Sequence, residues 1–168
     1  QKAGAVDETR YNLPASVSDA NIVLLCIPLN EIRDTLKVIA SDLQEGTVVM
    51  DTAPAKGTVA AWVEELLPPG RHYVGLSPAA GATYLHNADL GVDSARADLF
   101  KDGLFLINTP RGTPGEAVKL AMDLVELLGA QSMLSDAVEA DGLLASTPIL
   151  PQLIAAALLD STVDQPGW

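Results

Sequence analysis

The segment NIVLLCIP, residues 21–28, sets the expected fold of this chain. A continuous apolar run that ends at proline is typical of a strand buried on both faces, as inside a parallel sheet. The pattern after it changes to apolar residues at helical spacing, Ile32, Leu36, Ile39 and Leu43. A buried strand followed by an amphipathic helix predicts a β–α unit.

The same alternation continues along the chain. Further strands are predicted at 47–51, 72–76, 104–108 and 131–134, with helices over 58–66 and 115–128 and a helical region from Asp136 onward. Apolar strands that alternate with helices predict an α/β fold with a parallel sheet and right-handed crossovers. We therefore expect a parallel sheet followed by a helical tail.

Composition narrows the classes of protein. The 168 residues are 48% hydrophobic and 19% charged, which is typical of a globular domain. The net charge of −12 argues against binding to nucleic acid or to an anionic membrane. Cys26 is the single cysteine, which excludes an internal disulfide and suits a reducing cytosol; we expect a small buried apolar group there. No apolar run reaches the roughly 20 residues that span a bilayer.

Three strand-end segments are candidates for a ligand site. They are Cys26–Pro28, Asp51–Lys56 and the loop Ser77–Gly81. Ligands of parallel α/β sheets bind outside the carboxyl ends of the strands, so these segments can line one crevice. Their small residues allow a flat ligand to approach the backbone closely.

The order and spacing of several segments resemble the prephenate/arogenate dehydrogenases, over about residues 2–159. These segments are IVLLCIP, GTVVMDTAPAKG, LLPPGRHYVGLSPAAG, ADLFKDGLFLINTP, LVELLGAQ and EADGLLASTPILPQLIAAAL. The resemblance implies a partial Rossmann-type NAD(P)-binding domain over 1–135, followed by the start of a helical dimerisation region over 136–168. It also implies an oxidoreductase of tyrosine biosynthesis that transfers hydride from a cyclic hydroxy acid, acting as a cytoplasmic homodimer on a small-molecule substrate.

The resemblance also assigns residues to roles. Ser77 and Lys56 take the catalytic positions. NAD or NADP is expected against five residues at the ends of the first two strands, namely Ile27, Pro28, Thr52, Ala53 and Pro54. Substrate is expected against Pro78, Ala80 and Gly81.

Two departures from the family affect these expectations. First, the sequence holds no G-x-G-x-x-G turn. In the family that turn comes before the segment that matches Gly4–Tyr11, and this segment is expected to form a short edge strand. Without the strands that carry that turn, strand 22–27 has an unpaired edge. We therefore expect the chain to be a piece of a longer protein or to have this edge covered by another chain, and we expect tight dinucleotide binding by this chain alone to fail.

Second, the family's histidines are absent from the matching positions. Ser77 stands where the family has its catalytic histidine, and the helical motif reads Pro148–Gln152 without its two histidines. Serine without an activating neighbour is a poor general base at neutral pH. A non-catalytic binding or dimerisation module is therefore an alternative, and a β-hydroxyacid or imine-reducing enzyme is a third possibility.

Each candidate residue also has a purely structural interpretation. Ser77 can be a turn residue before proline, and Lys56 can be a solvated lysine near a helix start. His86 can replace the missing histidine or simply be exposed, and Asp51 is expected to brace its loop. Two distant histidines without clustered acids give no metal site.

Overall fold

The computed structural model describes residue 4, residues 6–80, residue 83 and residues 95–163. These residues form one sheet of five strands in the order β1-β2-β3-β4-β5. The strands are β1 (Ile22–Leu25), β2 (Val48–Asp51), β3 (His72–Ala79), β4 (Leu104–Asn108) and β5 (Gln131–Ser135). The predicted Rossmann-type α/β architecture is confirmed.

Strand direction differs from the prediction in one half of the sheet. β1, β2 and β3 are parallel, and β4 and β5 are parallel to each other, but β4 pairs with β3 in antiparallel fashion. The prediction of an entirely parallel sheet is therefore wrong. A parallel neighbour of β3 would need a crossover connection, usually a helix. The described residues between β3 and β4 contain no such helix, which agrees with the antiparallel pairing.

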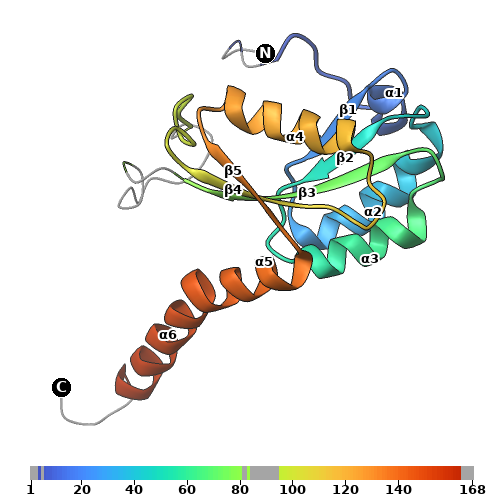
Figure 1. Cartoon of the computed structure of the whole chain (residues 1–168). Helices are drawn as coiled ribbons and strands as arrows, with labels where there is room; N and C mark the ends of the chain where they lie inside the picture. The colour runs from blue at the N-terminus through green and yellow to red at the C-terminus, as the bar shows by residue number, and fades with distance from the viewer. Residues whose placement is uncertain (1–3, 5, 81–82, 84–94, 164–168) are drawn as a thin grey trace.

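Helices cover the two faces of the sheet (Figure 1). α4 (Gly115–Leu127) packs on Val74, Leu76 and Ile107 of one face. α2 (Leu29–Ile39) and α3 (Lys56–Leu66) pack on the other face, where Val23 and Val49 lie at the centre of a second core. The alternation of side chains along each strand separates these two cores.

β1 is an edge strand and not an interior one. Ile22 and Leu24 are 39% and 43% exposed, whereas Val23 and Leu25 are buried, so the expected burial on both faces was wrong. Within the described sheet β1 pairs only with β2. This agrees with the expectation that the strands which carry the family's glycine-rich turn are absent from this sequence. Cys26 follows the strand and is exposed, which contradicts the expected buried group, because the chain leaves the sheet there.

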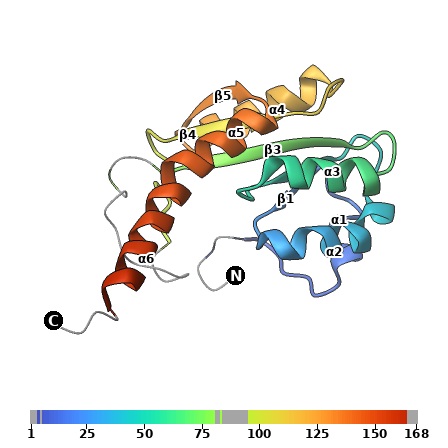
Figure 2. The ribbon, with the colours of Figure 1, turned by 90° about the horizontal axis from the view of Figure 1, so that it is seen from below.

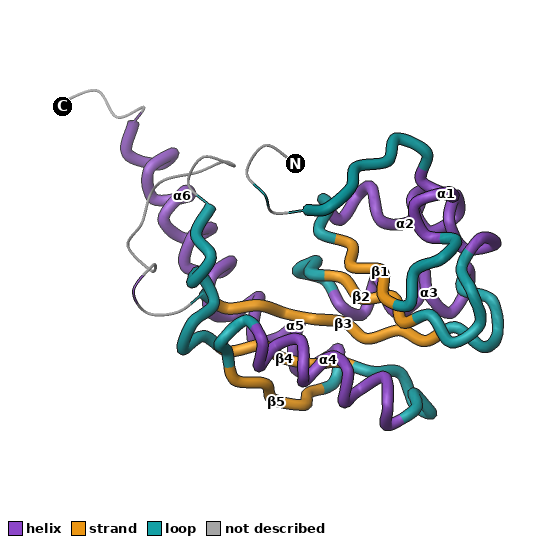
Figure 3. Tube along the Cα trace, turned by 90° about the horizontal axis from the view of Figure 1, so that it is seen from above, coloured by secondary structure: helices purple, strands orange, loops and turns teal. Residues whose placement is uncertain are grey.

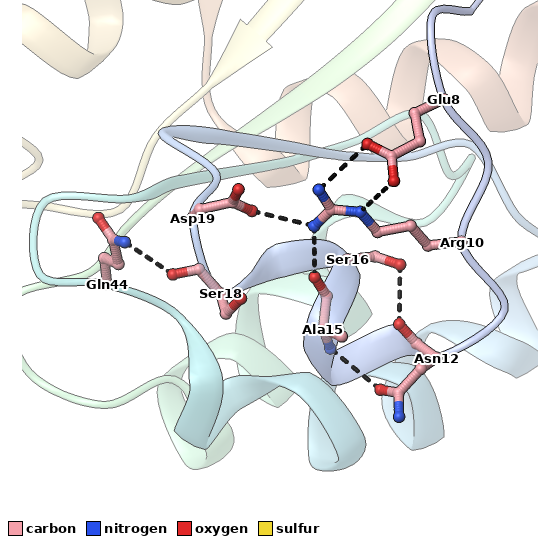
Figure 4. Close-up of polar contacts among 8 residues, drawn as sticks. All are labelled: Glu8, Arg10, Asn12, Ala15, Ser16, Ser18, Asp19 and Gln44. Atoms are coloured by element: carbon pink, nitrogen blue, oxygen red, sulfur yellow. Dashed lines mark hydrogen bonds and ion pairs between the residues drawn. The ribbon is translucent and has the colours of Figure 1, made fainter.

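The segment before β1 is not a strand. Among its described residues, Gly4–Tyr11 has no β pairing, and the chain instead enters a short helix, α1 (Leu13–Val17). Arg10 fixes the segment before α1 through ion pairs to Glu8 and Asp19, and the Asn12 side chain caps α1 (Figure 4). Polar contacts within the segment replace the expected strand.

The last described residues, 137–163, form a long helical rod. α5 (Ala137–Leu144), a π-helical turn (Ala145–Ile149) and α6 (Leu150–Val163) follow one another, and α6 extends away from the sheet (Figures 1 and 2). By length and composition alone the 27 residues from Ala137 to Val163 could cross a membrane, although Glu139, Asp141 and Asp160 interrupt the apolar residues. One such helix is weak evidence, because a helix that packs against other protein has the same composition.

Candidate functional site

The carboxyl ends of β1 and β2 lie side by side. Leu25 is in register with Asp51, and the backbone N–H of Thr52 donates to the Leu25 carbonyl at 3.3 Å. The predicted cofactor segments, Ile27–Pro28 and Thr52–Pro54, therefore follow adjacent strands at one edge (Figure 3 shows the trace). Pro28 and Pro54 are exposed there and Ala53 is buried. Their contact with a dinucleotide stays a prediction.

β3 is longer than predicted and carries Ser77 within it. Only its first half pairs with β2, while Gly75 to Ala79 pair with β4. Ser77 and Pro78 are thus strand residues, and the expected strand-end loop at Ser77 was wrong. Ala80 is partly buried just beyond the strand, and both Gly81 and His86 lie outside the described residues.

Asp51 is the centre of a buried polar network. Its carboxylate accepts hydrogen bonds from Lys56 Nζ at 2.8 Å, from Tyr73 Oη at 2.6 Å and from the Ala53 backbone N–H at 2.7 Å. Asp51 is 0% and Lys56 1% exposed. The prediction that Asp51 braces its loop is confirmed, whereas the solvated interpretation of Lys56 is wrong.

Burial and charge shift the pKa values of two members of this network. Desolvation lowers the pKa of the Lys56 ammonium, although the Asp51 carboxylate opposes that shift. Desolvation and the same carboxylate both raise the pKa of the Tyr73 hydroxyl. The Lys56–Asp51 contact is a two-point bond, because Lys56 Nζ also donates to the Asp51 carbonyl at 3.2 Å. We take Lys56 as charged at neutral pH, since a neutral amine would leave a buried carboxylate uncompensated.

Gly75 makes room for this network. A Cβ on Gly75 would lie 2.8 Å from Tyr73 Oη and 3.0 Å from Lys56 Cδ. Side chains of β3 alternate, so Tyr73, Gly75 and Ser77 share the face that α3 covers. Side chains of the protein itself therefore fill the space beside Gly75.

The helical rod is attached to the same network. Asp141 of α5 accepts hydrogen bonds from the backbone N–H groups of Lys56 at 2.6 Å and Gly57 at 2.9 Å. Ala55, at the N-cap of α3, provides no side-chain cap, so Asp141, which is 84 residues beyond Gly57, supplies it. Sequence reasoning missed this residue, because the contact joins segments that are distant in the chain.

Two buried polar side chains on this face have no hydrogen-bond partner among the described residues. They are Ser77, 5% exposed, and Asn108, 4% exposed. In the register Asn108 pairs with Gly75 and Leu106 with Ser77, so both side chains point to the same face. Sequence analysis missed Asn108; the only signal was a polar residue at the end of the apolar strand LFLIN.

Among the described residues, no group of three histidine, cysteine, aspartate or glutamate side chains could hold a metal ion. His72 lies at the start of β3, half-buried and away from the ends of β1 and β2.

A five-stranded sheet with helices on both faces and adjacent strand ends at one edge defines a Rossmann-type domain. The profile described as "Prephenate dehydrogenase, nucleotide-binding domain" matches residues 1–134. The chain belongs to the prephenate dehydrogenase family.

Individual relatives agree with this assignment. The chain is 29% identical over 154 residues to a cyclohexadienyl dehydrogenase of Zymomonas mobilis, covering 91% of this chain and 50% of that protein. The crystal structure of Synechocystis arogenate dehydrogenase aligns with a TM-score of 0.79 at 26% identity, over 95% of this chain and 54% of that one. Prephenate dehydrogenase from Aquifex aeolicus, in complex with hydroxyphenyl propionate and NAD+, aligns with a TM-score of 0.84 at 22% identity, over 99% and 56%.

The chain spans about half the length of these relatives. The matched half contains the strand-end edge, the Asp51 network and the first part of the helical rod.

Proposed function

We propose that this chain is part of an NAD(P)-dependent dehydrogenase of the prephenate or arogenate type. The observation that carries the proposal is the family match over residues 1–134, to a nucleotide-binding domain. The relative from Aquifex aeolicus, solved with NAD+ and hydroxyphenyl propionate, supports a dinucleotide and a small ring-bearing carboxylate as ligands. The comparisons give no support for a non-catalytic module.

The strand-end residues suit a nicotinamide. When bound, the cofactor accepts a hydride from the substrate carbon. Ile27, Pro28, Thr52, Ala53 and Pro54 would lie against it, because small residues and prolines follow β1 and β2 with little side-chain bulk. The Ala53 N–H is engaged by Asp51, so the loop has a fixed backbone course before any ligand arrives.

Lys56 and Ser77 have different parts in this proposal. Lys56 is fully engaged with Asp51, which suits a residue that fixes the loop and not one that transfers protons. Ser77 has an unpartnered hydroxyl that can donate to a substrate hydroxyl or carbonyl, while water or another group carries the proton. Pro78, Ala80 and Gly81 extend from Ser77 as the proposed substrate side.

The helical region is proposed to form a homodimer in the cytoplasm. We place the boundary between the two regions at 135/136, where β5 ends and Asp136 caps α5. Leu153, Leu158 and Leu159 of α6 are each more than 60% exposed, which supports burial against further protein. The proposed dimer is tested by measuring the mass of the longest protein encoded by the reading frame in analytical ultracentrifugation. A monomeric mass would contradict the dimer.

The activity is tested with that same longest protein. We expect it to reduce NAD+ or NADP+ with prephenate or arogenate, followed by absorbance at 340 nm. The 168-residue chain, titrated with NADH while the fluorescence of Trp62 is followed, is expected not to saturate at micromolar concentration. Failure of the longer protein to bind either cofactor would overturn the proposed function.

A further inference from the structure

We propose that a cavity on the α3 side of the sheet, which meets the strand-end segments only at Lys56, binds a small organic carboxylate that carries a hydrogen-bonding group at its far end. The cavity has a volume of about 740 Å³. It lies between α3, the turn before β3 and the segment 109–113 that leads from β4 to α4. Pockets of about 300–1,000 Å³ are typical of small-molecule sites.

The place of the cavity distinguishes it from the proposed cofactor site. Its wall includes Arg71 and His72 at the amino end of β3 and Thr109 to Thr113 after β4. None of Ile27, Pro28, Thr52, Ala53 or Pro54 lines it. A ligand here therefore does not compete with a dinucleotide at the ends of β1 and β2.

The charge of the cavity wall favours an anion. Arg71 and Arg111 line it with a single acid, Glu64, although the whole chain has 22 acidic and 10 basic residues. Lys56 also lines the cavity, but its charge is paired with Asp51. Neither arginine is ion-paired within the part of the chain that the structure describes. Arg71 is held in place by the backbone carbonyls of Leu43 and Pro69, which leaves its positive charge without a carboxylate.

The inner wall provides a reason for the second group on the ligand. Asn108 forms part of the wall, is 4% exposed, and neither its Nδ2 nor its Oδ1 has a partner among the described residues. A buried amide without hydrogen-bond partners is destabilising. A ligand group that both donates and accepts hydrogen bonds would satisfy both atoms of this amide.

The remaining wall is apolar and suits a flat ligand body. Ala60, Val63 and Leu67 of α3 and its following turn face the cavity, with Pro110 opposite. A matching ligand would have a carboxylate at Arg111 on the rim, an apolar middle, and an amide at the buried Asn108. This order of groups is what a para-substituted benzoate presents.

The test uses 4-carbamoylbenzoate as the probe and amide NMR spectra of the chain. We expect saturable shifts at Gly112, Thr113 and the Asn108 side-chain amide. Two matched probes each lack one group: 4-methylbenzoate has no amide, and benzamide has no carboxylate. Each is expected to bind at least about tenfold more weakly, since one hydrogen bond to a buried or charged group contributes roughly 1.5 kcal/mol.

Two variants and a control localise the binding. Arg111→Gln and Asn108→Leu are each expected to weaken binding about five- to tenfold, whereas Lys101→Gln, which removes an exposed charge outside the cavity, changes it less than about twofold. Arg111 is exposed, so its variant folds even if Asn108→Leu does not. Absence of saturation, shifts centred on Thr52 and Ala53, or equal effects of Arg111→Gln and Lys101→Gln would each overturn the proposal.

Discussion

The Asp141 carboxylate on α5 accepts a 2.6 Å hydrogen bond from the backbone N–H of Lys56, the first residue of α3. A second bond, from Gly57, completes the cap. The same lysine pairs through its side chain with Asp51, so one residue joins the helical rod to the end of β2. Figure 2 shows α3 and α5 on the same side of the sheet.

Replacing Asp141 is expected to uncouple the rod from the sheet. Asp141→Ala should lower the free energy of unfolding by about 1–2 kcal/mol, the usual cost of a lost helix cap. Hydrogen exchange at the Lys56 and Gly57 amides should accelerate, since both lose their acceptor. Asp160→Ala, an exposed acid on α6, serves as the control and should change stability by less than about 0.5 kcal/mol. Equal effects of the two substitutions would contradict the capping role.

The Asp51–Lys56 pair is expected to show strong coupling. Lys56→Met leaves the Asp51 carboxylate buried without its cation and should cost about 3–5 kcal/mol in urea unfolding. Adding Asp51→Asn to Lys56→Met should recover part of that loss, because the uncompensated charge is then removed. A double-mutant cycle measures the coupling. Additive effects would show that the two side chains act independently.

Gly75 and Gly142 give a matched pair of alanine substitutions. Gly75→Ala places a methyl group 2.8 Å from Tyr73 Oη and should destabilise the chain by about 1–3 kcal/mol through overpacking. A Cβ at Gly142, inside α5, meets nothing within 4 Å, so Gly142→Ala should stabilise the helix by up to about 1 kcal/mol. Thermal unfolding of both variants decides whether the polar network fills the space at Gly75.

Tyr73 should not ionise while the chain is folded. Its pKa is raised, so the stability that the protonated hydroxyl contributes is present below the ordinary value near 10 and is lost as pH rises above it. Absorbance at 295 nm should show that Tyr73→Phe leaves the alkaline titration of the folded chain unchanged. In denaturant the same substitution should remove about a third of the signal, since the chain has three tyrosines. A reduced signal in the folded state would contradict the buried hydrogen bond.

The sequence alone determined the type and position of most elements. The apolar runs at 22–27, 47–51, 72–76 and 104–108 appear as strands near their predicted bounds, because local patterning is a property of consecutive residues. The order of segments was sufficient to indicate the family, and the missing glycine-rich turn correctly predicted the open edge of β1.

Only the tertiary structure decided the direction of β4, the burial of Lys56 and the cap that Asp141 provides. Each depends on which segments meet in space, and periodicity along the chain carries no information on that. Lys56 looks solvated in sequence because lysines usually are; Asp51, Tyr73 and Gly75 together make its burial favourable. Asn108 likewise becomes a candidate only in the folded sheet, where Gly75 pairs with it and its amide has no partner among the described residues.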